Sequence, residues 1–493
     1  MIKVRKIFLF FLILISLSVL SAVDFDPYED YGRFQKGFSI GGAILLSFYK
    51  SSNGNKAFEL GIELYASAEF SMLGFGIDLP LRFIWGDDSI DTKNGIPKED
   101  WDDARDWVSI LTYFHYGHSG DMFYFYFGEQ RNRYVGNGSI VGAYYGDLRL
   151  YHPQRGVNLE VNTDYAGIDF FMDDVMPPNI IGGRVYLKPL SFFDKENYGN
   201  NLEIGASYFA DVFAPENIVG KIVEKKDGLY YDRDIYKSNV QIFGFDISFR
   251  PITMKYYQLA FYTDINHIVD AGTGLHFGAK HKLMFPGSMD IRILSRWEGR
   301  AMQPDYIPSY FDTFYDIERE YYKGQDEKTA YQPSTKSQYL REQLKKGEKW
   351  TGGYYFDLVF DLSTFQGSKL YKFAIGGSFE QNRLFNPGYI DNDKYGAAKK
   401  YNNYQVNVFL DTLISDFLAI DFLMTFHSLG EKGSWLKNAP YYKGSVTYYL
   451  NKFFSFGVRA ASKWYLSYSD EKKAGYYKYY NDFSIGGFAA LRF

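Results

Sequence analysis

Apolar and polar residues alternate along most of the chain from residue 36 onward. In residues 57–70, every second position carries an apolar side chain, and the positions between them include Glu59, Glu63 and Glu69. A period of two places the two sets on opposite faces of a β-sheet. The pattern therefore predicts a chain built from strands. It recurs in residues 73–85, 354–362 and 418–426.

The length of these runs separates two kinds of β protein. A soluble sandwich would alternate in the same way, but its strands average about 5 to 6 residues. The runs in this chain extend over about 9 to 14 residues, and a tilted strand needs about 9 to 11 residues to cross a bilayer. Strand length therefore favours strands that span a membrane.

Short and long connections alternate between the predicted strands, and this regularity distinguishes two sides of the sheet. The short turns are expected at residues 250–253, 285–288, 364–369, 415–416 and 451–452. The long polar connections are expected at residues 212–237, 298–350, 383–402, 429–440 and 467–480. The connection at residues 189–201 is an exception, because it is longer than expected for the side of the sheet on which it lies. Such asymmetry is typical of outer-membrane barrels, with short periplasmic turns and long external loops.

The predicted fold is a closed antiparallel transmembrane β-barrel of about 16 to 20 strands. Counting every turn gives about twenty strands, and merging the ambiguous ones lowers the number to sixteen or eighteen. Tryptophan gives an independent indication, because an interfacial aromatic belt is expected near strand ends. Five tryptophans lie near strand ends on the long-loop side: Trp85, Trp107, Trp297, Trp350 and Trp464.

The first 22 residues have the order of a secretory signal peptide: the basic residues Lys3, Arg5 and Lys6, an apolar run, and then small residues. A membrane anchor is the alternative, but the apolar run is shorter than the roughly 20 residues that a spanning helix needs. We therefore expect a signal peptide at 1–22, a short periplasmic segment at 23–35 and the barrel at 36–493. The chain has no cysteine, so neither a lipid-modified cysteine nor a disulfide is available.

Amino-acid composition limits the kinds of partner that the chain is expected to bind. Mean hydropathy is -0.30, as in a soluble protein, yet 20% of residues are aromatic, with 46 Tyr and 45 Phe. Aromatic residues form strands well, and Tyr suits a surface that is half apolar and half wet. With a net charge of -5 and no basic face, the chain is not expected to bind nucleic acid. Outside the leader no apolar run of 18 residues occurs, so any membrane span must be made by strands.

The pentapeptide FSIGG occurs twice, at residues 38–42 and 483–487. A sheet in hydrocarbon cannot leave an unpaired edge, so the first strand is expected to pair with the last. The final strand alternates apolar residues up to Phe493, and in this it resembles the signal by which bacterial outer-membrane β-barrel proteins are recognised by their assembly machinery. This resemblance implies a Gram-negative-type outer-membrane barrel, porin-like, whose partners are outer-membrane lipid and the barrel assembly machinery. It identifies no subfamily.

Strand parity predicts which charged residues face the lumen. The predicted pore-lining residues are Glu59, Glu63, Asp78, Arg82, Lys280, Lys282, Asp290, Arg292, Arg296, Asp357, Asp361, Lys372, Asp421 and Arg459. Glu69, Asp246, Glu380 and Lys463 share this parity. A lumen lined by both signs would pass small hydrophilic solutes with at most a mild preference for cations. The alternative is that opposite charges pair across strands and only solvate the wall.

Two segments could narrow the pore. Residues 128–156 combine several glycines with Glu129, Arg131, Arg133 and Arg149, and they alternate poorly. They could fold inward as a basic constriction, or form a kinked strand pair with the arginines at the rims. Residues 298–350 could bend inward, bind a ligand or lie outside as an exposed lid, and residues 337–349 are predicted to form a short helix capped by Ser337.

The function predicted from these features is a porin-like channel for passive diffusion of small hydrophilic solutes. No catalytic signature and no helical metal-binding pair occurs in the sequence, so no enzyme activity, metal or cofactor is predicted. Two alternatives stay open: a hydrophobic-substrate transporter, and a surface adhesin or binding barrel that uses Tyr-rich loops. About thirteen residues separate the leader from the first strand, too few for a plug domain. A homo-oligomer stays open as well.

Overall fold

Strands dominate the computed structural model of the chain. It describes residues 37–50, 56–86, 92–93, 95–97, 101–102, 104–146, 154–194, 199–225, 228–287, 289–303, 305–319, 335–337, 350–366, 369–382, 403–414, 417–429, 441–451, 454–469 and 476–492. The predicted leader and the segment after it, residues 1–35, lie outside the described residues.

Twenty of these strands form one sheet. They are β1 (Gly37–Lys50), β2 (Lys56–Glu69), β3 (Leu73–Trp85), β6 (Leu111–Tyr116), β7 (Phe123–Gly128), β8 (Gly156–Asn162), β9 (Ala166–Met172), β10 (Ile180–Leu187), β11 (Leu202–Asp211), β14 (Val240–Thr253), β15 (Tyr257–Ile268), β16 (Thr273–Phe285), β17 (Met289–Met302), β18 (Thr351–Gln366), β19 (Lys369–Asn382), β20 (Asn403–Ile414), β21 (Leu418–Leu429), β22 (Tyr441–Tyr449), β23 (Phe454–Ser469) and β24 (Tyr476–Arg492).

The remaining described elements lie outside this sheet. They are the strand pairs β4 (Thr92–Lys93) with β5 (Ile96–Pro97) and β12 (Pro215–Lys225) with β13 (Gly228–Lys237), the helices α2 (Ala104–Ser109) and α3 (Tyr315–Glu318), and the 3-10 turns η2 (Pro189–Phe192) and η3 (Gly199–Asn201). In the described part of the chain, no helix is long and apolar enough to cross a membrane.

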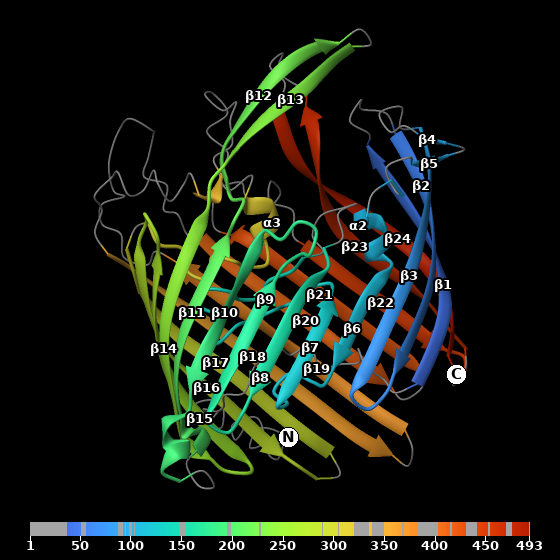
Figure 1. The fold of residues 1–493 in the computed structure, drawn as a ribbon. Coiled ribbons are helices and arrows are strands. Elements are labelled where there is room, and N and C mark those ends of the chain that lie inside the picture. Colours follow the sequence, from blue (N-terminus) through green and yellow to red (C-terminus); the bar gives the residue numbers. More distant parts are fainter. Residues whose placement is uncertain are drawn as a thin grey trace, which may run out of the picture.

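Each barrel strand pairs antiparallel with the next barrel strand in the chain, and β1 pairs with β24 (Figure 1). The pairing of β1 with β24 runs from Ser39 opposite Arg492 to Ser47 opposite Ser484. The sheet is therefore a closed cylinder of twenty strands, as predicted. The predicted pairing of the first strand with the last is confirmed.

Side-chain burial alternates along the strands in the reverse of a soluble protein. On β15, Phe261 and Ile265 are exposed on the outer surface, whereas the polar residues Asp264 and Asn266 are buried on the inner face. Ile44 on β1 is 56% exposed. A cylinder with an apolar outside and a polar inside is the arrangement of a membrane-spanning barrel. The fold class predicted from the sequence is confirmed.

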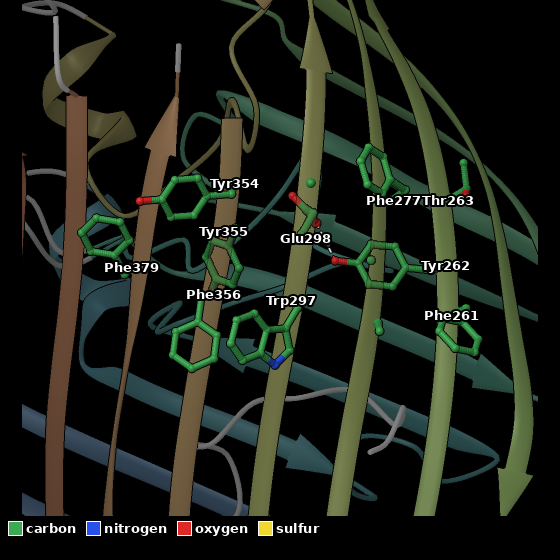
Figure 2. Close-up of a pocket in the computed structure, with 13 residues that line it drawn as sticks. Phe261, Tyr262, Thr263, Phe277, Trp297, Glu298, Tyr354, Tyr355, Phe356 and Phe379 are labelled. Carbon is green, nitrogen blue, oxygen red and sulfur yellow. Dashed lines mark hydrogen bonds between the residues drawn. The ribbon is translucent and has the colours of Figure 1, made fainter. Parts of the chain in front are cut away.

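Figure 2 shows this alternation on the neighbouring strands β15 to β19. Phe261, Trp297 and Phe356 lie on the outer surface, and they border a hollow of about 830 Å³ whose lining includes Gly299. Between them, Tyr262 points inward and its hydroxyl donates a hydrogen bond to Glu298 Oε2 at 2.6 Å. One strand thus presents hydrocarbon to the outside and a hydrogen-bonding group to the lumen.

The connections differ between the two ends of the barrel as expected, with two corrections. Residues 250–253 belong to β14, which carries a register shift between Phe249 and Ile252; the turn follows at residues 254–256, where Tyr257 N–H donates to Met254 O. Residues 215–237, predicted as a loop, are mostly the paired strands β12 and β13, which project beyond the rim (Figure 1).

Strand length also departs from the prediction in one sector. The strands β6 to β10 have only 6 to 8 residues, fewer than the expected 9 to 14. Conversely, β23 and β24 reach Ser469 and Tyr476, into the connection expected at residues 467–480. The short sector is the one against which the connection after β7 folds inward, as described next.

Candidate functional site

The connection after β7 leaves the wall and enters the lumen. We call residues 129–146 the first inward segment. At Gly128, φ is 148°, and a Cβ there would stand 2.5 Å from Thr112 O, so only glycine fits where the strand ends. Gly136 and Gly138, with φ of 58° and 78°, then turn the chain back on itself. These glycines make the inward turn sterically possible.

A part of the connection between β17 and β18 joins it. We call residues 305–319, which include α3, the second inward segment. Val141 and Phe311 form an isolated parallel β-bridge. Gly142 N–H donates to Phe311 O at 3.1 Å, and Phe311 N–H donates to Ile140 O at 3.1 Å. Two segments more than 150 residues apart in sequence thus hold each other through backbone hydrogen bonds.

Aromatic and aliphatic side chains of both segments take part in the largest hydrophobic cluster among the described residues. Tyr144 and Phe311 of the inward segments pack with Phe171, Phe209 and Ile242 of the wall. All five are essentially inaccessible to solvent. The lumen therefore contains an apolar core on one side, where a simple open pore would hold only water.

Polar side chains attach the first inward segment to the same side of the wall. Asn137 Nδ2 donates to Asp264 Oδ1 on β15 at 2.8 Å. Arg296 on β17 donates to Asn137 O at 2.5 Å, pairs with Asp357 on β18 at 3.1 Å and stacks on the Tyr355 ring at 4.0 Å. These contacts hold the segment to three strands, and each buried polar group gains a partner.

Further charges on the covered wall are also paired. Arg184 bonds Asp246 at 2.7 Å and lies 3.6 to 3.7 Å from Glu203 and Asp169. Arg300 lies 3.1 Å from Glu380. The pairs are almost completely buried, and a buried charge is tolerated only with such partners.

Elsewhere on the inner wall, some charged groups stay in contact with solvent. Arg292 pairs with Asp361 and Arg459 with Glu63, and each of these arginine side chains is 37% exposed. Lys372 lies 3.0 Å from Asp411. At the start of the first inward segment, Arg131, 36% exposed, pairs with Glu129. Asp78 lies within electrostatic reach of Glu63, Arg459 and Glu129, so charges of the wall lie close to a charge of the first inward segment.

Further predicted site residues lie at other positions on the wall, and the role of each as pore lining stays a prediction. Arg82 lies 3.8 Å from Glu59, and Asp421 accepts a hydrogen bond from Ser445. Lys280 lies over the Tyr262 ring at 5.4 Å, and Lys282 is half-buried on β16. Asp290 lies at the turn end of β17, where it accepts a hydrogen bond from Gly287 N–H.

Other predicted positions require correction. Arg296 and Asp357 do not line open water, because the first inward segment covers them. Arg133, expected in a basic constriction, is buried against Glu160 at 2.9 Å. Ser337, expected to cap a helix, donates its hydroxyl to Pro215 O at 2.6 Å. Arg149, Phe493 and residues 338–349 lie outside the described residues, as does the Lys463 side chain.

Sequence reasoning missed the groups that fix the inward segments. Nothing in the sequence marks Asn137 and Tyr355 as contact residues, because an amide in a glycine-rich stretch and a Tyr in a strand are both common. The sequence of the second inward segment does indicate burial, because YFDTFYD, residues 310–316, is rich in aromatic residues for a polar loop. Such a run in a connection is expected to be buried.

Comparison with known proteins gives a distant likeness only. No protein-family model and no curated protein sequence matches the chain. Among solved structures, Pseudomonas aeruginosa OpdL is 10% identical with a TM-score of 0.30, covering 92% of this chain and 96% of that one. Pseudomonas aeruginosa OccK8 (OprE) is also 10% identical, with a TM-score of 0.32, and the match covers 93% of this chain and 98% of that one. Wzi, an Escherichia coli outer-membrane protein described as a carbohydrate-binding β-barrel, is 10% identical with a TM-score of 0.33. The match covers 92% of this chain and 84% of Wzi. At these values the fold rests on the strand pairing of the chain itself.

Proposed function

We propose that this membrane-spanning barrel is a porin-like channel of a Gram-negative-type outer membrane, through which small hydrophilic solutes diffuse passively. The observation that carries the proposal is the asymmetry of the lumen. The inward segments pack on the wall from β7 to β18 and also reach Tyr441 on β22, whereas the ion pairs Arg459–Glu63 and Arg292–Asp361 keep half-exposed arginines. A narrow polar passage beside a packed plug would admit small solutes and exclude large ones.

The charge pattern of this passage predicts weak ion selectivity. Its exposed arginines, Arg131, Arg292 and Arg459, each have an acidic partner. Paired charges leave little net field for selecting one sign over the other. We expect a reversal potential near zero under a tenfold KCl gradient.

Single-channel recording in planar bilayers tests the proposal. The change is replacement of residues 130–145 by a short Gly-Ser turn, which removes the first inward segment but leaves the β7 and β8 strands. We expect small ohmic steps from the native chain and steps at least about twofold larger from the variant, because conductance grows with open cross-section. Arg296→Ala, which removes one of the contacts between the same segment and the wall, is the second variant if the deletion fails to fold.

Two results would contradict the proposal: the first excludes a channel, and the second excludes its constriction by the inward segments. One is silence of the native chain and both variants after reconstitution of folded barrels. The other is equal conductance in all three, because the inward segments would then lie away from the path.

A surface-binding barrel is the second candidate, and one observation favours it. The β12–β13 hairpin projects beyond the rim on the long-loop side (Figure 1). Deleting residues 216–236 should leave conductance unchanged if the hairpin serves adhesion alone. The charged wall disfavours the third candidate, a hydrophobic-substrate transporter. Recognition of the final strand by the assembly machinery, through Phe493, belongs to the same proposal.

A further inference from the structure

A lysine ammonium is enclosed on the second inward segment. Lys336 is 1% exposed. Its Nζ lies 2.7 Å from Glu318 Oε2 and 3.5 Å from Asp312 Oδ1. The same Nζ lies 5.1 Å from the ring centroid of Tyr310 and 5.3 Å from that of Tyr315. Two carboxylates and two aromatic rings therefore surround one positive charge.

The four surrounding side chains, which we call the ammonium cage, come from one short stretch of chain, residues 310–318. They are Tyr310, Asp312, Tyr315 and Glu318, and contacts that do not involve Lys336 help to hold them. Tyr315 hydroxyl donates to Asp211 on β11 at 2.7 Å, and Asp312 Oδ1 accepts Phe314 N–H at 3.1 Å. Glu318 lies at the end of α3, where its own N–H donates to Phe314 O. The cage is therefore built by the fold of the second inward segment.

The charges of the cage favour a cation. Asp312 and Glu318 supply two negative charges, and the neighbouring Arg319 pairs with Asp211. Lys336 neutralises one of the two. Burial disfavours the lysine charge, but Asp312 and Glu318 outweigh burial and raise the pKa of Lys336 above its usual value. The surroundings thus stabilise a desolvated ammonium group.

Lys336 reaches the cage from a separate part of the chain. Its neighbour Ser337 donates to Pro215 O at 2.6 Å, and Thr335 is fully buried. Nothing in the cage requires that the ammonium be attached to this chain. An amine of the same shape would meet the same four groups.

We propose that Tyr310, Asp312, Tyr315 and Glu318 form a binding site for primary alkylammonium groups, and that Lys336 occupies it as a tethered ligand. The ligand class is a solute with a primary amine on an unbranched aliphatic stem. Carboxylates at 2.7 and 3.5 Å call for N–H donors, which a quaternary ammonium lacks. A tethered competitor acts at a local concentration of about millimolar or higher, so a free amine competes weakly in the native chain. This inference does not rest on the proposed channel function.

Removing the tethered ligand tests the site. The variant is Lys336→Ala in the full barrel, purified in detergent, and the probe is n-butylammonium, which reproduces the lysine stem. We expect the variant to melt at a lower temperature than the native chain. About 50 mM n-butylammonium should raise that melting temperature saturably by about 2 °C or more, because a ligand that binds only the folded state stabilises it. Lys336→Met, which keeps the apolar stem, replaces Lys336→Ala if the latter does not fold.

Three controls decide the outcome. n-Butanol, which lacks the charge, and tetramethylammonium, which lacks N–H donors, should not raise the melting temperature of the variant. The double variant Lys336→Ala with Glu318→Gln should lose at least tenfold in apparent affinity for n-butylammonium. Lys280→Ala, which vacates a single aromatic contact at 5.4 Å, should not respond.

The proposal fails if n-butanol stabilises Lys336→Ala as well as n-butylammonium does, or if the Glu318→Gln change leaves the response intact. Tetramethylammonium as effective as n-butylammonium would also overturn it. Because binding is measured on the barrel in detergent, a failure of the channel in bilayers leaves this result unaffected.

Discussion

Asp173, directly after β9, is a buried carboxyl group that has no counter-charge within hydrogen-bonding distance in the described part of the chain. Its Oδ1 accepts N–H groups of Asn179 at 3.0 Å and Ile180 at 2.8 Å, and its Oδ2 has no hydrogen-bond partner among the described residues. Burial, and then the nearby Asp316, raise the pKa of Asp173 well above 3.8. A raised carboxyl pKa means that folding favours the protonated form.

Asp173→Asn should therefore stabilise the barrel at neutral pH. The native carboxyl stabilises the fold fully below its ordinary pKa near 3.8 and loses this contribution as pH rises. Asn keeps an Oδ1 acceptor and carries no charge, so the variant should show a melting temperature higher by about 2 to 4 °C at pH 7 and a flatter pH dependence above pH 4. Thermal unfolding followed by circular dichroism between pH 4 and pH 8 measures both.

Asp211→Asn is the matched control with the opposite sign. Asp211 is equally buried, but Arg319 and the Tyr315 hydroxyl bond to it. Removing one partner of a buried pair costs about 3 to 5 kcal/mol. Stabilisation by both Asn variants, or by neither, would show that pairing does not decide their effects.

At this scale the sequence predicts the face on which a residue lies but not its partner. Parity correctly placed Arg296 and Asp357 on the inner face of β17 and β18. It could not show that Asn137, about 160 positions away from Arg296 in sequence, covers them. Such a contact depends on how a loop folds in three dimensions, which a period of two does not encode.

At the scale of elements, the inward segments depend on each other. Their contact is made by backbone groups around Gly142, whose missing side chain leaves the necessary space. A Cβ at Gly142 would stand 2.5 Å from Gly138 O and 3.1 Å from Ser309 Oγ. Close backbone approach of this kind requires glycine.

Gly142→Ala should separate the two segments. We expect loss of the hydrogen bonds between Gly142 and Phe311 and between Phe311 and Ile140, at a cost of about 1 to 3 kcal/mol. Hydrogen exchange of the amides in residues 138–144 and 309–313 should become about tenfold faster or more. Gly287→Ala is the control, because a Cβ there meets nothing closer than 3.8 Å. Unchanged exchange in Gly142→Ala would rule out a tight backbone contact.

Glycine content indicated which element departs from the strand pattern, but two outcomes stayed open for it. Residues 128–156 alternate poorly, which favours both an inward segment and a kinked strand pair. Which of the two conformations residues 128–156 adopt depends on the aromatic run at residues 310–316, because side chains of both stretches pack in one hydrophobic cluster. The second segment could be interpreted only once its partner was known.

At the scale of the whole molecule, an apolar outside and a polar inside follow directly from strand parity. This is why the closed barrel, its strand number of about 16 to 20 and its two different ends were predictable from one sequence. The sequence did not predict the projecting β12–β13 hairpin or the short strands β6 to β10. Both features depend on segments that leave the barrel wall, which strand parity does not describe.

Ile44→Arg tests the lipid-facing surface. Ile44 lies in the middle of β1 and is 56% exposed. An arginine at the bilayer midplane costs about 2 to 4 kcal/mol, and near the interface about 0 to 1 kcal/mol. Urea titration in lipid vesicles should give the larger loss for Ile44→Arg and the smaller for Phe38→Arg, near the strand end. Equal losses would argue against this position of the barrel in the bilayer.

The contact between β1 and β24 has a consequence for how the barrel is made. It joins residues 39–47 to residues 484–492, the widest sequence separation of any strand pair in the described sheet. Joining chain ends so far apart is entropically costly and slow. Until this pairing forms, β1 and β24 each present an edge of unpaired backbone groups, and such edges need shielding from other chains during biogenesis.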